Sequence, residues 1–381
     1  MSDKKNIFTK GVELPEVVEK KAKEAFAEIR KEGFDMRREY QEKKKRGFFS
    51  GKVAVAACVC ILAAGSITAV AAVNHFWSRG MQGNLQATQE EQKKLLEKGV
   101  AEVISEKEAE KAEVTSNGVT VKPMETIVDG KYAYLSFSVE GYQPEKKEEP
   151  FFESVDVYLE SREKEKAALN VNSNFYDGIV PDENGKPVYE DGTPLKYRKD
   201  GSIIAHYQDE NGTLEYVIVL SPADKDIDLT GRKIHVDFSN LGTVSKASYE
   251  NRLTGEWDFT LSLSGKNVAK KYQPEAAAAD TGFVVDTVEL SPISVEIYYT
   301  VQRKIKMSGD DIGIPEFSGV VLKDGTFLRF LANGGSTYLD ENMKNAYERK
   351  SFDRVLNVDE VRAILLRTEA DENMIEIPLE K

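Results

Sequence analysis

The stretch VAVAACVCILAAGSITAVAAV, at residues 53–73, determines how the rest of the chain is organised. It has 21 residues and no charged side chain. At the helical rise of about 1.5 Å per residue it extends about 31 Å, close to the ~30 Å hydrocarbon core of a bilayer. A helix satisfies every backbone N–H and C=O group internally, as a segment that crosses a membrane must. We therefore predict a transmembrane helix over residues 53–73.

The charges on either side of this stretch predict its direction. Residues 43–46 (KKKR) and Lys52 precede it, whereas the first basic residue after it is Arg79. Positive charge near a span stays in the cytoplasm, so we expect residues 1–52 inside and residues 74–381 outside the cell membrane. A cleaved signal peptide is the alternative interpretation, with residues 69–71 (AVA) as the cleavage site. The 52 residues before the apolar stretch are far longer than the basic start of a signal peptide, which favours an uncleaved anchor.

Charge and cysteine content limit what the outer part can do. Residues 1–52 hold 15 Lys and Arg against 10 Asp and Glu, a net charge of +5, and the remainder has −18. An acidic outer part argues against direct binding of nucleic acid or of anionic lipid. Both cysteines, Cys58 and Cys60, lie inside the predicted span. The outer part therefore has no disulfide, which fits a surface protein of a Gram-positive bacterium.

A second pattern lies in the cytoplasmic segment. Its apolar residues recur at helical spacing and form one stripe of an amphipathic helix over about residues 15–32; the stripe includes Leu14, Val18, Ala22, Phe26 and Ile29. A helix of this length is marginal alone in water, so the stripe needs a partner: another protein, the membrane surface or itself. The mixed Glu and Lys charges favour a protein partner, because helices that lie on membranes are usually basic on the polar face. The alternative is a helix that lies on the surface or is frayed.

We expect residues 74–113 to form a helical stalk. Thr88 and Glu91 form a capping box, which predicts a helix from Gln89 to Lys98 that ends at Gly99. From residue 114 the pattern becomes alternating, and Asn117-Gly118 and Asp129-Gly130 predict turns between the strands.

The outer part is therefore predicted to be mainly β, with two β-sandwich-like domains at residues 114–266 and 281–381 and a linker between them. Trp257 is predicted to be a core residue. The alternation in residues 132–139 changes phase, which indicates a bulge or a strand buried on both sides. Residues 340–350 are predicted to be a short helix or loop.

Candidate catalytic chemistry is sparse. The outer domains contain His206 and His235, each within a strand pattern, and no zinc-protease, thiol-redox, nucleophile-elbow or Walker motif. The tetrapeptide Asp-Glu-Asn-Gly occurs at residues 182–185 and 209–212, but without the spacing of a calcium-binding loop. Plain turns are the favoured interpretation, with calcium left open. We expect no cofactor, no metal and no enzymatic activity.

Three stretches resemble a known family. They are ELPEVVEKKAKEAFAEIR near the N-terminus, WSRGMQGNLQATQEEQ after the span, and GVTVKPMETIVDGKYAYLSFSVEGY in the first β unit. The chain resembles the family called domain of unknown function 4179 (DUF4179), single-pass membrane proteins of Gram-positive bacteria regarded as anti-sigma factors or related signalling proteins. The resemblance implies that the cytoplasmic helix holds an extracytoplasmic-function sigma factor and that the outer domains sense envelope stress. It brings no catalytic residues.

Two functions follow as hypotheses. In the first, the chain is an anti-sigma factor whose stripe packs into a groove of the sigma factor, and a signal releases the factor when a protease cuts the stalk and then the span. In the second, it is a membrane-anchored surface module that binds cell wall or protein, and the inner helix is a tether without a role in transcription.

Overall fold

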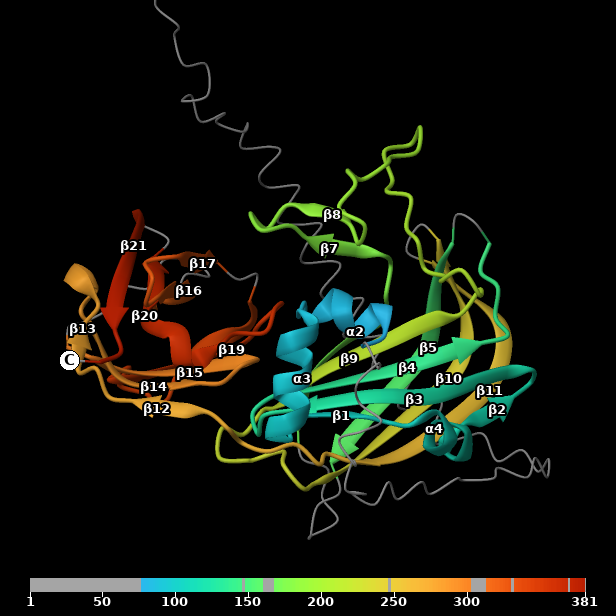
Figure 1. Cartoon of the computed structure of the whole chain (residues 1–381), viewed down its shortest axis with the longest axis horizontal. Helices are drawn as coiled ribbons and strands as arrows, with labels where there is room; N and C mark the ends of the chain where they lie inside the picture. The colour runs from blue at the N-terminus through green and yellow to red at the C-terminus, as the bar shows by residue number, and fades with distance from the viewer. Residues whose placement is uncertain are drawn as a thin grey trace, which may run out of the picture. The chain divides into compact units, whose positions relative to one another are not determined.

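The computed structural model describes residues 77–145, 148–159, 168–245, 248–302, 313–329, 332–368 and 371–380. The predicted cytoplasmic helix and the predicted span lie outside these residues. No helix in the described part of the chain is long and apolar enough to cross a membrane. That part is mainly β, as the sequence predicts, and its strand pairs form antiparallel sheets (Figure 1).

The first half of the described chain contains three helices and the strands of two sheets. The helices are α2 (Arg79–Asn84), α3 (Gln89–Lys98) and α4 (Glu106–Ala112). The strands are β1 (Ala101–Val103), β2 (Val114–Ser116), β3 (Val119–Val128), β4 (Ala133–Glu140), β5 (Glu149–Leu159), β6 (Leu169–Phe175), β7 (Ile179–Pro181), β8 (Pro187–Tyr189), β9 (Leu214–Pro222), β10 (Lys233–Ser245) and β11 (Ser248–Ser262).

The second half contains shorter strands and two 3-10 helices, η2 (Ala279–Thr281) and η3 (Val358–Glu360). The strands are β12 (Lys270–Tyr272), β13 (Ala276–Ala277), β14 (Phe283–Leu290), β15 (Ser294–Val301), β16 (Glu316–Leu322), β17 (Phe327–Arg329), β18 (Asn333–Tyr338), β19 (Asn345–Ser351), β20 (Val361–Thr368) and β21 (Asp371–Pro378).

These strands form four larger sheets and one ribbon. Sheet 1 has the order β1-β3-β4-β9-β6, with β2 also paired to β3, and sheet 2 has the order β11-β10-β5. Sheet 3 has the order β12-β14-β15-β19-β18, with β13 also paired to β14, and sheet 4 has the order β17-β16-β20-β21. The ribbon consists of β7 and β8.

Sheets 1 and 2 enclose the first hydrophobic core. Phe137 of β4 lies edge-on to Phe238 of β10, with ring centroids 5.2 Å apart. Trp257 of β11 is fully buried, which confirms its predicted place in the core, and its indole N–H donates to the Val119 carbonyl oxygen at 3.0 Å. A buried indole needs such an acceptor, because an unpaired polar group in the core is costly.

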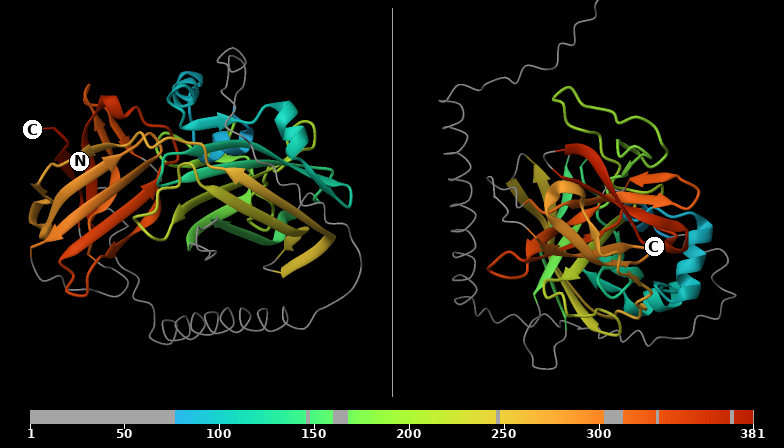
Figure 2. Two further views of the ribbon diagram at one scale, coloured as in Figure 1. Left: turned by 90° about the horizontal axis from the view of Figure 1, so that it is seen from below. Right: turned by 90° about the vertical axis from the view of Figure 1, so that its left-hand side faces the viewer.

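Helices α2 and α3 cover the face of sheet 1 that points away from sheet 2 (Figure 2). The predicted capping box is present, since the Thr88 hydroxyl accepts from the Glu91 N–H and the Glu91 carboxylate accepts from the Thr88 N–H. Gly99 ends α3 with a φ of 69°, the left-handed conformation that glycine adopts readily. The predicted helix Gln89–Lys98 is therefore confirmed.

From Trp77 onward, the residues that we expected to form a stalk pack against the sheet. They do so because their apolar side chains are buried in one cluster with residues of sheet 1. These side chains are Trp77, Met81, Leu85 and Leu95. This packing also explains the phase change in β4.

Strand β4 is buried on both faces. Leu135 and Phe137 point into the core against sheet 2, whereas Tyr134 points toward α2 and α3. The register of the neighbouring β3 shifts between Pro123 and Glu125, which marks a bulge or irregularity. The phase change in the sequence therefore reflects a strand with two buried sides.

Sheets 3 and 4 enclose the second core, which contains Phe283, Tyr299, Phe317 and Ile364. Part of the predicted linker belongs to sheet 3, since β12 and β13 pair with β14.

The region at residues 340–350 was expected to be a short helix or loop, and this expectation is wrong for residues 345–350. They lie in β19, between β15 and β18. The charges of Glu348, Arg349 and Lys350 made this strand look like a surface segment, but all three side chains are buried in ion pairs.

Candidate ligand-binding cleft

A cleft of about 460 Å³ opens between one edge of sheet 1 and one edge of sheet 3. Small-ligand sites usually have volumes of about 300–1,000 Å³. Most of its lining residues are uncharged and polar or aromatic. The lining comprises Asn84, Tyr132, Tyr134, Asn170, Val171, Asn172, Val219, Ser221, Pro222, Ala223, Asn333, Gly334, Gly335, Ser336, Thr337, Tyr347, Arg349, Ser351 and Phe352.

Strands β6 and β18 form the two sides of this cleft. Each is the last strand of its sheet, and among the described residues β6 pairs with β9 and β18 with β19. Successive side chains of a strand point to opposite faces of the sheet. Residues 170–172 and residues 333–337 nevertheless all line the cleft, so the edges of the strands border it rather than one face of either sheet.

Two buried tyrosines form part of the lining. The Tyr134 hydroxyl donates to the Phe352 carbonyl oxygen at 2.8 Å and so joins β4 to the end of β19. The Tyr132 hydroxyl lies 3.4 Å from the carbonyl oxygens of Asn333 and Arg349. Burial raises the pKa of Tyr132 to about 12 and raises the pKa of Tyr134 as well. Both phenols are therefore neutral at physiological pH and act as hydrogen-bond donors.

Arg349 is the charged residue of the lining, and each nitrogen of its guanidinium donates a hydrogen bond within the protein. Nε donates to Glu296 at 2.6 Å, and the two terminal nitrogens donate to the carbonyl oxygens of Pro222 at 2.7 Å and Lys225 at 3.3 Å. Because Arg349 belongs to sheet 3 and Pro222 to sheet 1, this side chain ties the two sheets together beside the cleft.

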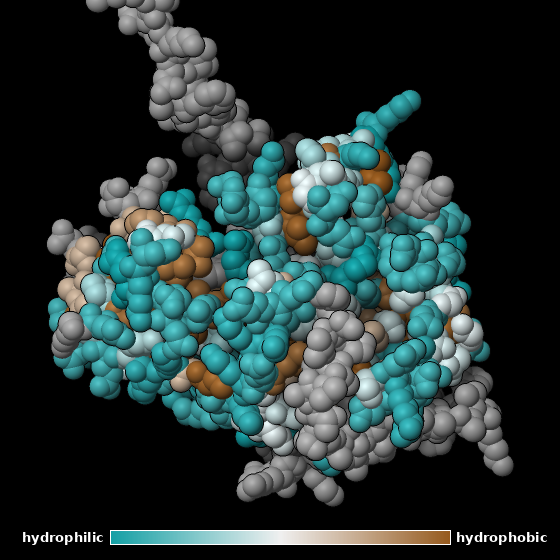
Figure 3. Space-filling view, in the orientation of Figure 1, coloured by the Kyte–Doolittle hydropathy of each residue, from teal (hydrophilic) through white to brown (hydrophobic). Residues whose placement is uncertain are grey.

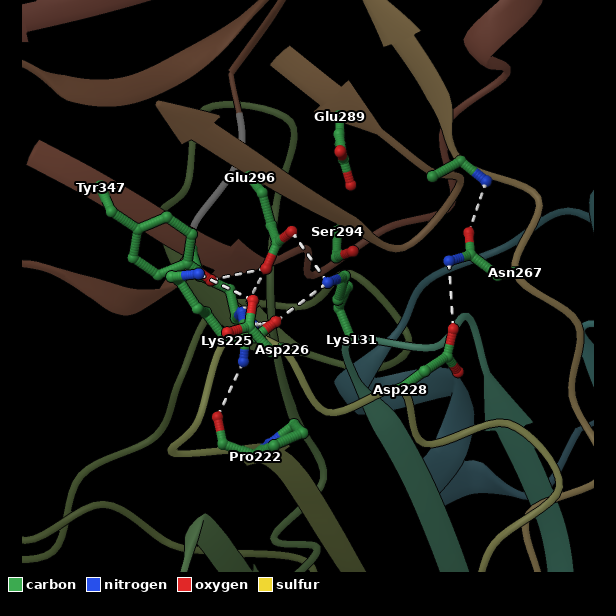
Figure 4. Close-up of polar contacts among 12 residues, drawn as sticks. Lys131, Pro222, Lys225, Asp226, Asp228, Asn267, Glu289, Ser294, Glu296 and Tyr347 are labelled. Atoms are coloured by element: carbon green, nitrogen blue, oxygen red, sulfur yellow. Dashed lines mark hydrogen bonds and ion pairs between the residues drawn. The ribbon is translucent and has the colours of Figure 1, made fainter. Parts of the chain in front are cut away.

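Glu296 is the centre of a buried polar cluster (Figure 4). Its carboxylate accepts from the Tyr347 hydroxyl and forms an ion pair with Lys131, whose Nζ lies 3.3 Å from Oε2. The side chain of Glu296 is only 1% exposed. A buried carboxylate needs such partners, since desolvation of an unpaired charge costs several kcal/mol. The cluster therefore fixes the wall of the cleft rather than presenting a free charge to it.

Asp129 joins the same two regions through two turns. One carboxylate oxygen accepts from the backbone N–H groups of Lys131 and Tyr132 at 2.9 and 2.8 Å and holds the turn between β3 and β4. The other oxygen accepts from the hydroxyls of Ser291 and Ser294, at the turn between β14 and β15. The predicted turn at Asp129-Gly130 is thus also a contact between sheets 1 and 3.

Helix α2 is attached to sheet 1 by two buried carboxylates at its first turn. Glu125 accepts from the backbone N–H of Ser78 at 2.8 Å, and Glu215 accepts from the backbone N–H groups of Arg79, at 3.2 Å, and of Gly80. The first N–H groups of a helix have no partner within the helix, so carboxylates at this end are favourable. Burial raises the pKa of Glu125 to about 7 and raises the pKa of Glu215.

Two glycines allow α2 to approach the sheet closely. A Cβ atom on Gly80 would lie 2.9 Å from a Glu215 oxygen, and one on Gly83 would lie 2.1 Å from the Tyr176 ring. This close approach lets the carboxylates of the sheet reach the backbone of the helix.

The other end of α2 reaches the cleft. Asn84, its last residue, belongs to the lining. The next connection, at Gln86, exchanges backbone hydrogen bonds with residues 353 and 355 beyond β19, at 2.7 and 2.8 Å. The short helix α2 and the residues directly after it therefore contact sheet 1, the cleft and the segment after β19.

No protein-family model matches the chain, and no curated protein matches it. Among solved structures, the chain is similar to one described as the conserved domain protein from Bacillus anthracis. The identity is 15%, the match covers 70% of this chain and 89% of that chain, and the TM-score is 0.44.

The residues that the sequence singled out lie elsewhere. Leu14, Val18, Ala22, Phe26 and Ile29 fall outside the described residues, so their proposed contact with a partner stays a prediction.

The residues singled out within the outer part have local roles. His206 stacks on Tyr189 and His235 on Tyr158, with ring centroids 4.2 and 4.7 Å apart. The two Asp-Glu-Asn-Gly stretches form turns in which the first aspartate accepts backbone N–H groups of its own turn. Within the part of the chain described here, no group of three or more His, Cys, Asp or Glu side chains is placed to hold a metal ion.

Sequence reasoning missed the cleft because it is formed by segments far apart in the chain. One signal was available: the stretches LNVNSNF at β6 and NGGSTY at β18 contain no charged residue, in a chain of which 31% of residues are charged. The face drawn in Figure 3 is covered mostly by hydrophilic residues, with apolar residues in small separate patches.

Proposed function

We propose that this chain is a single-pass membrane signal transducer of the anti-sigma type. In this proposal residues 1–52 lie in the cytoplasm and hold an extracytoplasmic-function sigma factor, residues 53–73 cross the cell membrane, and the β region lies outside and binds the signal. The resemblance to the DUF4179 family supports the proposal. The finer fold that we propose for the outer region is two β-sandwich-like domains, each with one of the two cores.

The observation that carries the proposal is the attachment of α2. Arg79, its first residue, follows the predicted span closely in sequence, and its first turn is held by Glu125 and Glu215. Its last residue, Asn84, lines the cleft. A ligand that enters the cleft would therefore touch the same short helix that leads to the membrane. This is the connection that a transmembrane sensor needs and that a passive tether does not.

A second candidate function is favoured by the cleft alone. The chain would then be an anchored surface module that binds its ligand without acting on transcription, and residues 1–52 would be dispensable. In both proposals the chain is not an enzyme.

A change in transcription separates the two candidates. Replacing Leu14 and Phe26 by Asp places charge on the apolar stripe and should release the sigma factor. A matched control replaces Lys20 and Lys31 by Asp, because the helical period places these two residues on the opposite face. We expect one coherent set of genes to rise in the first strain and to stay unchanged in the control. If transcripts are the same in all strains, the anti-sigma proposal fails and the surface-module proposal remains.

A further inference from the structure

The edges that border the cleft differ from most other sheet edges in the described part of this protein. An exposed strand edge invites pairing with another chain, and proteins usually protect such edges with charged residues, proline or bulges. The terminal strands β1, β5, β11, β12, β17 and β21 each contain at least one charged residue. Strands β6 and β18, by contrast, contain neither charge nor proline. Among the described strands that pair on one side only, the three-residue β2 and the two-residue β13 share this feature, but β6 and β18 are longer and border the same cleft.

The backbone along these edges is accessible. Asn170, Val171 and Asn172 of β6 are exposed, as are Gly334 and Gly335 of β18. A Cβ atom on Gly335 would meet no atom within 4 Å, so the absence of a side chain there leaves bare main chain in open space. Gly334 has a different role, because its Cβ atom would collide with the carbonyl oxygen of residue 349 across the strand pair.

The lining also limits the chemistry of the ligand. Its hydrogen-bonding groups are amides, hydroxyls and main chain, and the guanidinium of Arg349 is already engaged by Glu296 and two carbonyl oxygens. A charged ligand would therefore lose its hydration here without gaining a free partner of opposite charge. An uncharged ligand that carries regularly spaced donors and acceptors suits both edges.

We propose that the cleft binds an extended, uncharged segment of a partner polypeptide, which adds as a strand to the free edge of β18 and lies along β6. Strand addition of this kind takes its affinity from main-chain hydrogen bonds and its specificity from alternate side chains. This inference rests on one part of the proposed function, namely that the outer region binds the signal. Binding itself does not require the sigma factor, so the two proposals fail separately.

The test is a binding measurement on the full chain in lipid nanodiscs. The probe is a display library of random 12-residue peptides, and the best binder is then synthesised with a fluorophore for titration by anisotropy. Two variants block the cleft: Gly335→Trp fills the open space beside β18, and Val171→Lys gives β6 the kind of charge that the other edges carry. Lys271→Trp is the matched control, because Lys271 is exposed on β12 at the opposite edge of the same sheet.

We expect the library to yield peptides that are uncharged in the bound segment. The best peptide should bind both cleft variants at least tenfold more weakly than the wild type, and its affinity for the control should change less than twofold. Methylation of single peptide nitrogens should weaken binding at alternate positions, because every second N–H of an added strand points to the edge. The proposal is overturned if no peptide is enriched, if the cleft variants bind as well as the wild type, or if methylation is tolerated at every position. It is also overturned if the cleft variants abolish self-association of the chain or binding of cell-wall glycan fragments instead.

Discussion

We predict that the attachment of α2 to sheet 1 weakens as the pH rises, because the carboxyl group of Glu125 then loses its proton. Burial raises its pKa from the usual value near 4.5 to about 7 in the folded chain. Between these two values the folded state binds more protons than the unfolded state, so the free energy of unfolding falls with increasing pH. A shift of this size corresponds to about 3 kcal/mol. The stabilisation that the protonated Glu125 contributes is thus fully present below about pH 4.5 and is lost as the pH rises through about 7.

Replacing Glu125 by Gln removes the titration of this side chain and keeps its hydrogen bonds, whereas Glu215, whose pKa is also raised, still titrates in the variant. The amide oxygen can accept from the Ser78 N–H, and the hydroxyls of Ser78 and Ser136 can accept from the amide nitrogen, because a hydroxyl serves in either role. The variant should therefore be as stable as the wild type near pH 5 and more stable near pH 8.

Tryptophan fluorescence offers a local assay for this prediction. The chain has two tryptophans, and Trp77 precedes Ser78 directly. In a Trp257→Phe background, Trp77 is the sole tryptophan and reports on the docking of α2. Between pH 5 and pH 8, we expect urea titrations to show a loss of about 2–3 kcal/mol with Glu125 present and a much smaller loss in the Glu125→Gln variant. Equal pH dependence in both proteins would refute the reasoning.

Three further predictions concern stability and are measured by urea denaturation of the full chain. Replacing Gly83 by Ala should cost about 1–3 kcal/mol, because the new methyl group would overlap the ring beneath α2, whereas Gly335→Ala should change stability by less than about 0.5 kcal/mol; equal unfolding midpoints would contradict the close approach. Arg349→Met should cost about 3–5 kcal/mol by leaving Glu296 without its main partner, and adding Glu296→Leu should recover much of that loss; strictly additive effects would show that the pair does not interact. Trp257→Ala should cost about 3–5 kcal/mol through the cavity in the first core; a loss below about 1 kcal/mol would place this ring outside the core.

Local patterns predicted much of the fold. The capping box at Thr88, the Asn117-Gly118 turn and the alternation through Trp257 each depend on neighbours in sequence, and each has the predicted structure. Asn117 and Gly118 both have positive φ, as a two-residue hairpin loop with a type I′ turn requires.

The segments that the sequence did not predict correctly owe their structure to contacts with residues far away in the sequence. Strand β19 looks like a charged surface segment, and partners from other strands make its burial favourable, among them Glu296 for Arg349 and the Tyr299 hydroxyl for Glu348. In the sequence, the segment after the predicted span looks like a stalk. The carboxylates that hold it, Glu125 and Glu215, belong to β3 and β9, so no pattern within the segment itself indicates that it packs against the sheet. The cleft needs residues 170–172 beside residues 333–337, and no local pattern relates these segments. The contacts of the cytoplasmic stripe stay a prediction.

The anti-sigma proposal requires the cytoplasmic segment to hold a sigma factor. The most direct test is to purify the full chain from native membranes in mild detergent and to identify by mass spectrometry the proteins that accompany it. The account predicts one sigma factor with the wild type and with the Lys20→Asp, Lys31→Asp control, and its loss with Leu14→Asp, Phe26→Asp. Recovery of no sigma factor with the wild type, or equal recovery with all three proteins, would contradict the account.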